Sequence, residues 1–120
     1  MAEEIGRVND QLEAYIAVRL GGGVIECLID TGFGGTLLLP RSIATQNNLP
    51  ITGQENLGGV EGFAFTAQVA AAQVSWLGDD FLVQVFISDY EEALLGVEML
   101  VDAKLEIDYL KLTARIVKMV

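Results

Sequence analysis

The chain has 120 residues, of which 52% are hydrophobic, and its 17 acidic and 7 basic residues give a net charge of -10 at neutral pH. This length fits one domain, and the negative charge argues against nucleic-acid and membrane partners, because phosphate backbones and anionic lipids repel it. Histidine is absent and Cys27 is the single cysteine, so Ser-His-Asp and Cys-His catalysis, an intrachain disulfide and most zinc sites are excluded. Any catalysis would have to use carboxylates, hydroxyls or lysines, and we expect no metal and no cofactor.

Residues 1–11 are polar and charged, which predicts a flexible N-terminal arm in front of a single domain over residues 12–120. The first four residues, MAEE, are acidic, whereas a secretory signal would begin with basic residues followed by apolar ones. The sequence contains no uninterrupted run of about 18 apolar residues, so it does not predict a membrane-spanning segment. We therefore expect a cytoplasmic protein. A domain this small cannot bury so much apolar surface by itself, which favours a subunit interface.

Strict alternation of apolar and polar residues predicts a half-buried strand over residues 12–20, and three glycines then turn the chain into an apolar strand over residues 24–29. Cys27 lies within this second strand and is predicted to be a small core residue. Pro40 and Asn48 are the start and stop signals of one short helix over residues 41–47. Up to residue 88, the remaining patterns predict a short strand over 36–39, a glycine-rich hairpin over 57–66, and strands over 63–76 and 81–88. Beyond it they predict an acidic loop over 89–92, a short strand over 93–96, a helical turn over 97–101, and strands over 105–109 and 112–119.

The apolar strand over residues 24–29 ends on Asp30, and Thr31 and Gly32 follow in a sharp turn. Burial raises the pKa of a carboxylate unless donors or positive charges stabilise it, so an acid in this position indicates either a function or a partner. Thr31 can offer a hydroxyl and Gly32 an unobstructed backbone N–H. Asp30 is therefore the candidate catalytic residue.

Three features, in this order along the chain, resemble those of the retropepsin-like aspartic proteases, specifically the small single-domain bacterial kind. Residues 29–32, Ile-Asp-Thr-Gly, resemble the apolar-Asp-Thr-Gly motif of that family, and residues 58–65 lie where its glycine-bearing flap hairpin belongs. Residues 93–96, Ala-Leu-Leu-Gly, resemble its apolar-apolar-Gly motif. The resemblance covers roughly residues 12–119, and it departs from many members at Phe33, where they carry Ser or Ala.

The resemblance implies an all-β fold, a closed and mostly antiparallel barrel with one or two short helices, that is active as a two-fold homodimer. Each subunit would supply one Asp30, and the two carboxylates would activate a water to hydrolyse a peptide bond of a polypeptide substrate. Thr31 would form a hydrogen bond across the dimer axis, and Gly32 would donate its N–H to the carboxylate. The substrate contacts that the resemblance implies are Gly34, Gly59, Val60, Glu61, Gly62 and Leu95.

Other interpretations of the same residues remain open. The Asp-Thr-Gly sequence is also consistent with an ordinary turn after a strand. The glycine-rich residues 32–35 suggest a phosphate cradle, but a helix would have to begin at once, whereas residues 36–39 are predicted as a strand. The acidic pairs at 79–80 and 91–92 lack the further ligands of a calcium loop. The alternative function is that of a catalytically inactive dimer of the same fold that binds extended polypeptide.

Overall fold

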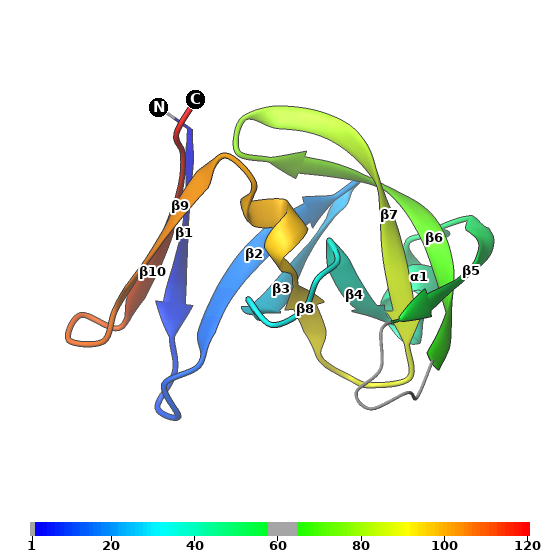
Figure 1. Cartoon of the computed structure of the whole chain (residues 1–120), viewed down its shortest axis with the longest axis horizontal. Helices are drawn as coiled ribbons and strands as arrows, with labels where there is room; N and C mark the ends of the chain where they lie inside the picture. Colours follow the sequence, from blue (N-terminus) through cyan, green and yellow to red (C-terminus); the bar gives the residue numbers. More distant parts are fainter. Residues whose placement is uncertain (1, 58–64) are drawn as a thin grey trace.

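The computed structural model describes residues 2–57 and 65–120, which form a β-structure with one short α-helix and one 3-10 helix (Figure 1). The elements in chain order are β1 (Glu3–Val8), β2 (Ala14–Leu20), β3 (Gly23–Ile29), β4 (Leu37–Pro40), α1 (Arg41–Gln46), β5 (Ile51–Leu57), β6 (Phe65–Trp76), β7 (Asp79–Ser88), β8 (Ala93–Leu95), η1 (Val97–Leu100), β9 (Ala103–Asp108) and β10 (Thr113–Lys118). Neither helix is long and apolar enough to cross a membrane.

Six strands close into a barrel. They are neighbours in the order β6, β7, β4, β8, β3 and β2, and β2 closes the ring by pairing with β6 at Leu20 and Val74. The β3–β8 and β4–β7 pairs are parallel, and the other pairs around the ring are antiparallel. The predicted closed all-β barrel with short helices is therefore confirmed, and its sheet is mixed.

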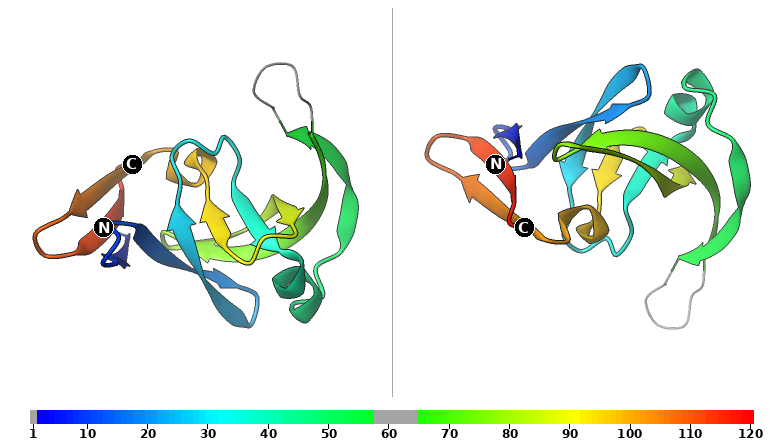
Figure 2. Two further views of the ribbon diagram at one scale, coloured as in Figure 1. Left: turned by 90° about the horizontal axis from the view of Figure 1, so that it is seen from below. Right: turned by 90° about the horizontal axis from the view of Figure 1, so that it is seen from above.

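Outside the barrel the sheet continues beyond β2 through β1, β10 and β9, while β5 extends it beyond β6. Figure 2 shows β9 and β10 standing to one side of the barrel, with the two chain ends close together. The backbone N–H of Lys118 donates to the carbonyl of Ala2 over 3.0 Å, which ties these ends to each other.

Strand β2 illustrates how alternation determines the inner face of the barrel. Ala14, Ile16, Val18 and Leu20 are all buried, as their spacing of two residues predicts. Leu12, which continues the same pattern in the sequence, has a φ of 64° and a side chain that is 60% exposed. The predicted strand therefore begins two residues later, because the chain is still turning at Leu12.

The barrel interior holds the main apolar core. Cys27 is fully buried there, as predicted, and burial raises the pKa of its thiol to about 12. Complete burial of a side chain such as Ile16 or Leu39 contributes about 1.5–3 kcal/mol to stability. The indole N–H of Trp76 donates to the carbonyl of Met99 over 2.9 Å, so the buried ring holds η1 against the barrel wall.

The prediction of a flexible arm over residues 1–11 is wrong for the central part of this segment, because Glu3–Val8 form strand β1 between β2 and β10. The charges that suggested an arm are used in contacts with distant strands. The Glu3 carboxylate accepts a hydrogen bond from Arg115 over 2.5 Å. The Glu4 carboxylate accepts one from the backbone N–H of Leu77 over 3.0 Å and also pairs with Arg19. These partners lie far away along the chain, so the local sequence does not reveal them.

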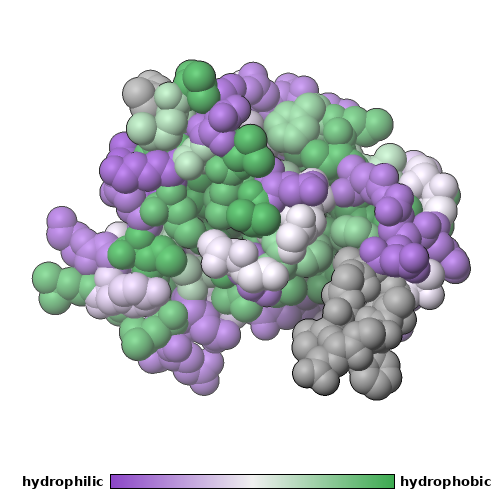
Figure 3. Space-filling model, in the orientation of Figure 1, coloured by the Kyte–Doolittle hydropathy of each residue, from purple (hydrophilic) through white to green (hydrophobic). Residues whose placement is uncertain are grey.

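The short helix α1 is confirmed at Arg41–Gln46, directly after Pro40. Asn48 has a φ of 52°, the left-handed conformation expected of a helix stop. Apolar side chains are exposed outside the barrel, where Ile5 on β1 is 61% accessible and Leu110, in the turn between β9 and β10, is 91% accessible. Figure 3 shows apolar patches on one face of the molecule, interrupted by hydrophilic residues.

Candidate active site

Asp30 lies directly after β3, on a turn that hydrogen bonds hold in place. Its backbone N–H donates to the carbonyl of Leu95 over 2.9 Å, and its own carbonyl accepts from the N–H of Phe33 over 3.1 Å. The N–H of Gly32 donates to Asp30 Oδ1 over 2.9 Å, the contact that the family resemblance implied. The carboxylate is half-buried and has a fixed orientation relative to its own turn.

Parallel pairing of β3 with β8 brings together the two motif segments that the sequence places about sixty residues apart. Cys27, Leu28 and Ile29 lie opposite Ala93, Leu94 and Leu95 in this ladder. The Asp-Thr-Gly turn and the glycine at position 96 therefore leave the barrel at the same edge.

Three further hydrogen bonds attach the start of η1 to the turn after Asp30. The N–H groups of Gly96, Val97 and Glu98 donate to the carbonyls of Thr36, Phe33 and Gly35 over 2.7, 2.9 and 3.2 Å, in that order. A Cβ atom on Gly96 would stand 2.1 Å from the carbonyl oxygen of Gly35, so only glycine permits this close approach. The start of η1 and the turn after Asp30 are thus joined by three hydrogen bonds and a close backbone contact.

Among the predicted substrate contacts, Leu95 differs from expectation. Its side chain is fully buried in the core, and what faces the turn is its carbonyl, which accepts the N–H of Asp30. The reason is the alternation along β8, which points Ala93 and Leu95 into the barrel. Leu95 therefore positions the Asp30 turn and does not line a surface that a substrate could reach.

Thr31 and Gly34 are exposed on the turn. Thr31 forms no side-chain hydrogen bond within the described residues, and its bond across a dimer axis stays a prediction. Gly34 lines the cavity beside the turn. The flap residues predicted to contact substrate, Gly59, Val60, Glu61 and Gly62, lie outside the described residues, and that prediction stays open.

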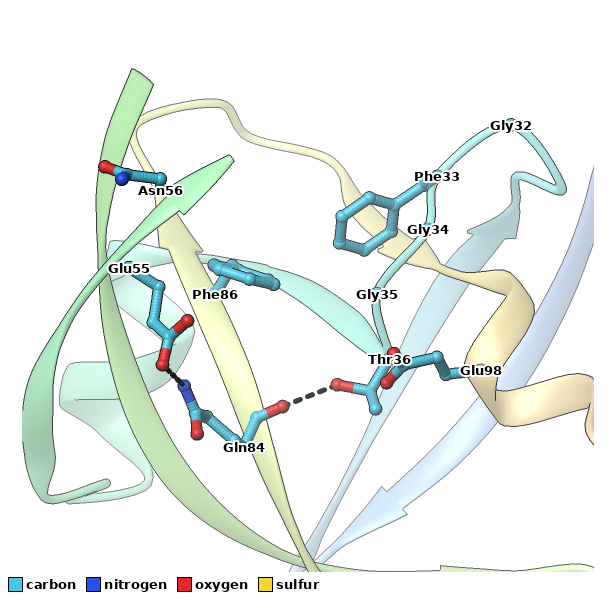
Figure 4. Close-up of a pocket in the computed structure, with 10 residues that line it drawn as sticks. All are labelled: Gly32, Phe33, Gly34, Gly35, Thr36, Glu55, Asn56, Gln84, Phe86 and Glu98. Carbon is cyan, nitrogen blue, oxygen red and sulfur yellow. Dashed lines mark hydrogen bonds between the residues drawn. The ribbon is translucent and has the colours of Figure 1, made fainter. Parts of the chain in front are cut away.

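A cavity of about 560 Å³ adjoins the Asp30 turn, and Figure 4 shows the side chains around it. The turn contributes one wall of this cavity, beginning at Gly32, two residues after Asp30, which is not itself among the lining residues. The other walls come from β5, β7 and η1. The lining residues are Gly32, Phe33, Gly34, Gly35, Thr36, Glu55, Asn56, Gln84, Phe86 and Glu98.

Two aromatic rings meet edge to face in this cavity. The centroids of Phe33 and Phe86 lie 6.0 Å apart, with an interplanar angle of 68°. A Cβ atom on Gly35 would stand 2.8 Å from the Phe33 ring and 3.0 Å from the Phe86 ring, so the absence of a side chain there lets both rings close over the backbone. Phe33, which departs from the motif pattern that the sequence otherwise resembles, thus has a packing partner.

Hydrogen bonds connect the cavity walls to one another. The Thr36 hydroxyl donates to the carbonyl of Gln84 over 2.6 Å, and Gln84 Nε2 donates to Glu55 Oε1 over 3.2 Å. Sequence reasoning missed Glu55, Gln84, Phe86 and Glu98. Alternation along β7 does place Gln84 and Phe86 on one outward face, but no local signal indicates that this face meets the turn after Asp30.

Chemically, one chain offers one turn-held carboxylate beside an apolar and acidic cavity. The Gly32 N–H already occupies one oxygen of this carboxylate, which leaves the other for a water or a substrate group. A general acid and a general base are both needed to hydrolyse an amide, and a single carboxylate can act as only one of them at a time.

No protein-family model matches this sequence, and no curated protein matches it. Among solved structures, a crystal structure of a retropepsin-like aspartic protease from Rickettsia conorii is similar, with a TM-score of 0.69 and 22% identity over 95% of this chain and 89% of that one. The foamy viral protease-reverse transcriptase in complex with an RNA/DNA hybrid is similar with a TM-score of 0.57 and 14% identity, over 78% of this chain and 13% of that one. At these identities the similarity concerns the architecture, and this chain has a retropepsin-like fold.

Proposed function

We propose that this chain is an aspartic endopeptidase that is active as a homodimer, with Asp30 of each subunit supplying one carboxylate of a catalytic pair. The observation that carries the proposal is the Asp30 carboxylate on its hydrogen-bonded turn, beside a cavity of about 560 Å³, on a retropepsin-like fold. The turn and the η1 loop give this carboxylate the fixed placement that acid-base catalysis requires.

In the proposed mechanism, two Asp30 carboxylates face each other across a two-fold axis and share one proton, because two like charges a few ångströms apart resist full ionisation. This sharing is the known behaviour of the carboxylate pair of aspartic proteases. The ionised Asp30 takes a proton from a water, and the water oxygen attacks the peptide carbonyl carbon while the protonated Asp30 donates to the carbonyl oxygen. As the C–N bond breaks, one Asp30 gives a proton to the amide nitrogen and the other takes a proton from a hydroxyl of the tetrahedral intermediate, which leaves the pair with one proton again.

Two observations support a dimer. The chain contains one Asp-Thr-Gly sequence, and a symmetric dimer is the simplest way to bring two copies of it together. Apolar side chains are also exposed outside the barrel, at Ile5 on β1, at Leu110 in the turn between β9 and β10, and at Val120 at the end of the chain. Covering such residues with a second subunit removes apolar surface from water, which stabilises the assembly.

The test is the substitution Asp30→Asn. The amide keeps the shape of the carboxylate and can still accept the N–H of Gly32, but it cannot serve as a base. Cleavage of a peptide library should fall by roughly 10³-fold or more, while the circular dichroism spectrum and melting temperature stay close to those of the parent.

The control is Asp10→Asn, the same chemical change at an exposed carboxylate that makes no hydrogen bond among residues 2–57 and 65–120. It should cleave at the parental rate. If Asp30→Asn also cleaves at the parental rate, Asp30 is not the catalyst. If the parent binds extended peptides and cleaves none of them, the chain is a polypeptide-binding dimer.

A further inference from the structure

The cavity beside the Asp30 turn carries two carboxylates, Glu55 from β5 and Glu98 from η1. In Figure 4 the Glu55 side chain runs towards Gln84, and the Glu98 side chain runs towards Thr36. Glu55 accepts one hydrogen bond from a neutral amide, that of Gln84. Within the described residues neither carboxylate forms an ion pair, and no Lys or Arg lines the cavity.

Six of the seven basic residues of this chain form ion pairs elsewhere in the described structure, and the seventh, Lys111, lies in the turn between β9 and β10 and does not line the cavity. The described ion pairs join them to acids on other surfaces, and none reaches the cavity. The basic residues in these pairs are Arg7, Arg19, Arg41, Lys104, Arg115 and Lys118. The two cavity carboxylates are thus available for a positive charge that the substrate brings.

The rest of the cavity wall suits the stem of a long side chain. Phe33 and Phe86 present aromatic surface on which methylene groups can pack, and a cation near the ring faces gains additional attraction. An apolar side chain would match the rings, but it would remove water from Glu55 and Glu98 and offer them no partner. A lysine or arginine side chain matches both the rings and the carboxylates.

We propose that this cavity selects a lysine or arginine side chain of the polypeptide substrate, with Glu55 and Glu98 as specificity-determining residues and Phe33 and Phe86 packing against its stem. The inference rests on the proposed function, since it names the substrate class of the same site. The net charge of -10 acts in the same direction, because it attracts basic peptides and repels acidic ones.

The first test is cleavage of a peptide library made by digestion after acidic residues, which leaves lysine and arginine inside the peptides. Mass spectrometry of the products should show one of these residues enriched at a fixed position near the scissile bond. A synthetic peptide with arginine at that position should then be cleaved with a kcat/KM roughly tenfold above its citrulline counterpart, which has the same shape without the charge. The preference should shrink as salt concentration rises.

The double variant Glu55→Gln plus Glu98→Gln should lose this preference and still cleave the citrulline peptide. Its matched control is Asp10→Asn plus Glu91→Gln, which removes two exposed negative charges away from the cavity lining and should keep the preference. Equal loss of preference in both double variants would mean that overall charge is responsible, and it would overturn the assignment to Glu55 and Glu98.

A second measurement separates this inference from the proposed function. Fluorescence anisotropy with the Asp30→Asn protein should show the labelled arginine peptide binding about tenfold more tightly than the citrulline peptide. Selective binding by a chain whose parent cleaves no peptide would overturn the protease proposal and retain the cavity assignment. Cleavage with equal kcat/KM and equal binding for both peptides would overturn the cavity assignment and retain the protease.

Discussion

Gly96 lies so close to Gly35 that a Cβ atom on Gly96 would stand 2.1 Å from the Gly35 carbonyl oxygen. The two glycines belong to segments about sixty residues apart in the sequence, and their contact joins the start of η1 to the turn after Asp30. The placement of the candidate catalytic carboxylate therefore depends on a residue without a side chain.

The substitution Gly96→Ala should accordingly lower the free energy of unfolding by about 3 kcal/mol, because the backbone must move to admit a methyl group. Urea denaturation measures this change. The matched control is Gly34→Ala on the same turn, where an added Cβ would meet nothing within 4 Å and the change should stay below about 0.5 kcal/mol. Equal stability of the two variants would show that the loops separate easily.

Association of the proposed dimer should strengthen as the pH falls from neutral to about 5. Two subunits of charge -10 repel one another, and a facing carboxylate pair takes up a proton on association, so the dimer holds more protons than its separated subunits. This stabilisation is present at lower pH and is lost as the pH rises. Asp30→Asn removes the proton-binding pair and should flatten the pH dependence.

Sedimentation equilibrium at fixed salt concentration measures both dissociation constants. A single species of 12.9 kDa at micromolar concentration would contradict the dimer, and with it the shared catalytic pair. Weaker association at pH 5 than at neutral pH would contradict the proposed proton uptake.

Tyr15 should ionise late in an alkaline titration. Its hydroxyl donates to Glu92 Oε1 over 2.6 Å, and this hydrogen bond is the main cause that raises its pKa to about 12 from an ordinary value of 10.0. The raised pKa stabilises the folded chain fully below pH 10.0, and the stabilisation is lost as the pH rises towards about 12. The tyrosinate absorbance should contain a component near that upper pH, and Tyr15→Phe should remove it.

The control for this titration is Tyr90→Phe, since Tyr90 is 77% exposed and its hydroxyl makes no hydrogen bond in the described part of the chain. That variant should keep the late component. Its disappearance in Tyr90→Phe and persistence in Tyr15→Phe would reverse the assignment.

Asp108 should contribute to stability at neutral pH and lose that contribution in acid. Its Oδ1 accepts the backbone N–H groups of Lys111 and Leu110, both over 2.9 Å, and these bonds hold the pKa of the carboxyl below its ordinary value of 3.8. Because the pKa is lowered in the folded chain, the ionised carboxylate stabilises the fold above pH 3.8, and this stabilisation is lost as the pH falls through the folded-state pKa.

Asp108→Asn should therefore unfold at a lower urea concentration than the parent at pH 7, and the difference should narrow in acid. Asp10→Asn is the control and should show no such convergence. A constant difference between Asp108→Asn and the parent at every pH would mean that the turn over residues 109–112 depends on side-chain shape rather than on charge.

Several features could be predicted from the sequence because short stretches of chain encode them. Alternation identified the inner face of β2, and Pro40 and Asn48 marked both ends of α1. The turn after Asp30 was also predictable, since a strand that ends on Asp-Thr-Gly has its donors within two residues. Periodicity and turn chemistry act over a few residues, so one sequence suffices to detect them.

Only the tertiary structure decided which of these segments of the chain contact one another. It made β1 a strand by pairing its backbone with β10 and β2, it buried Leu95, and it gave the barrel its parallel pairs. It also brought Glu55 and Glu98 to one cavity beside the Asp30 turn. These outcomes depend on how the sheet closes, and closure is determined by the fit of distant strands around a common core, which no local pattern of residues records.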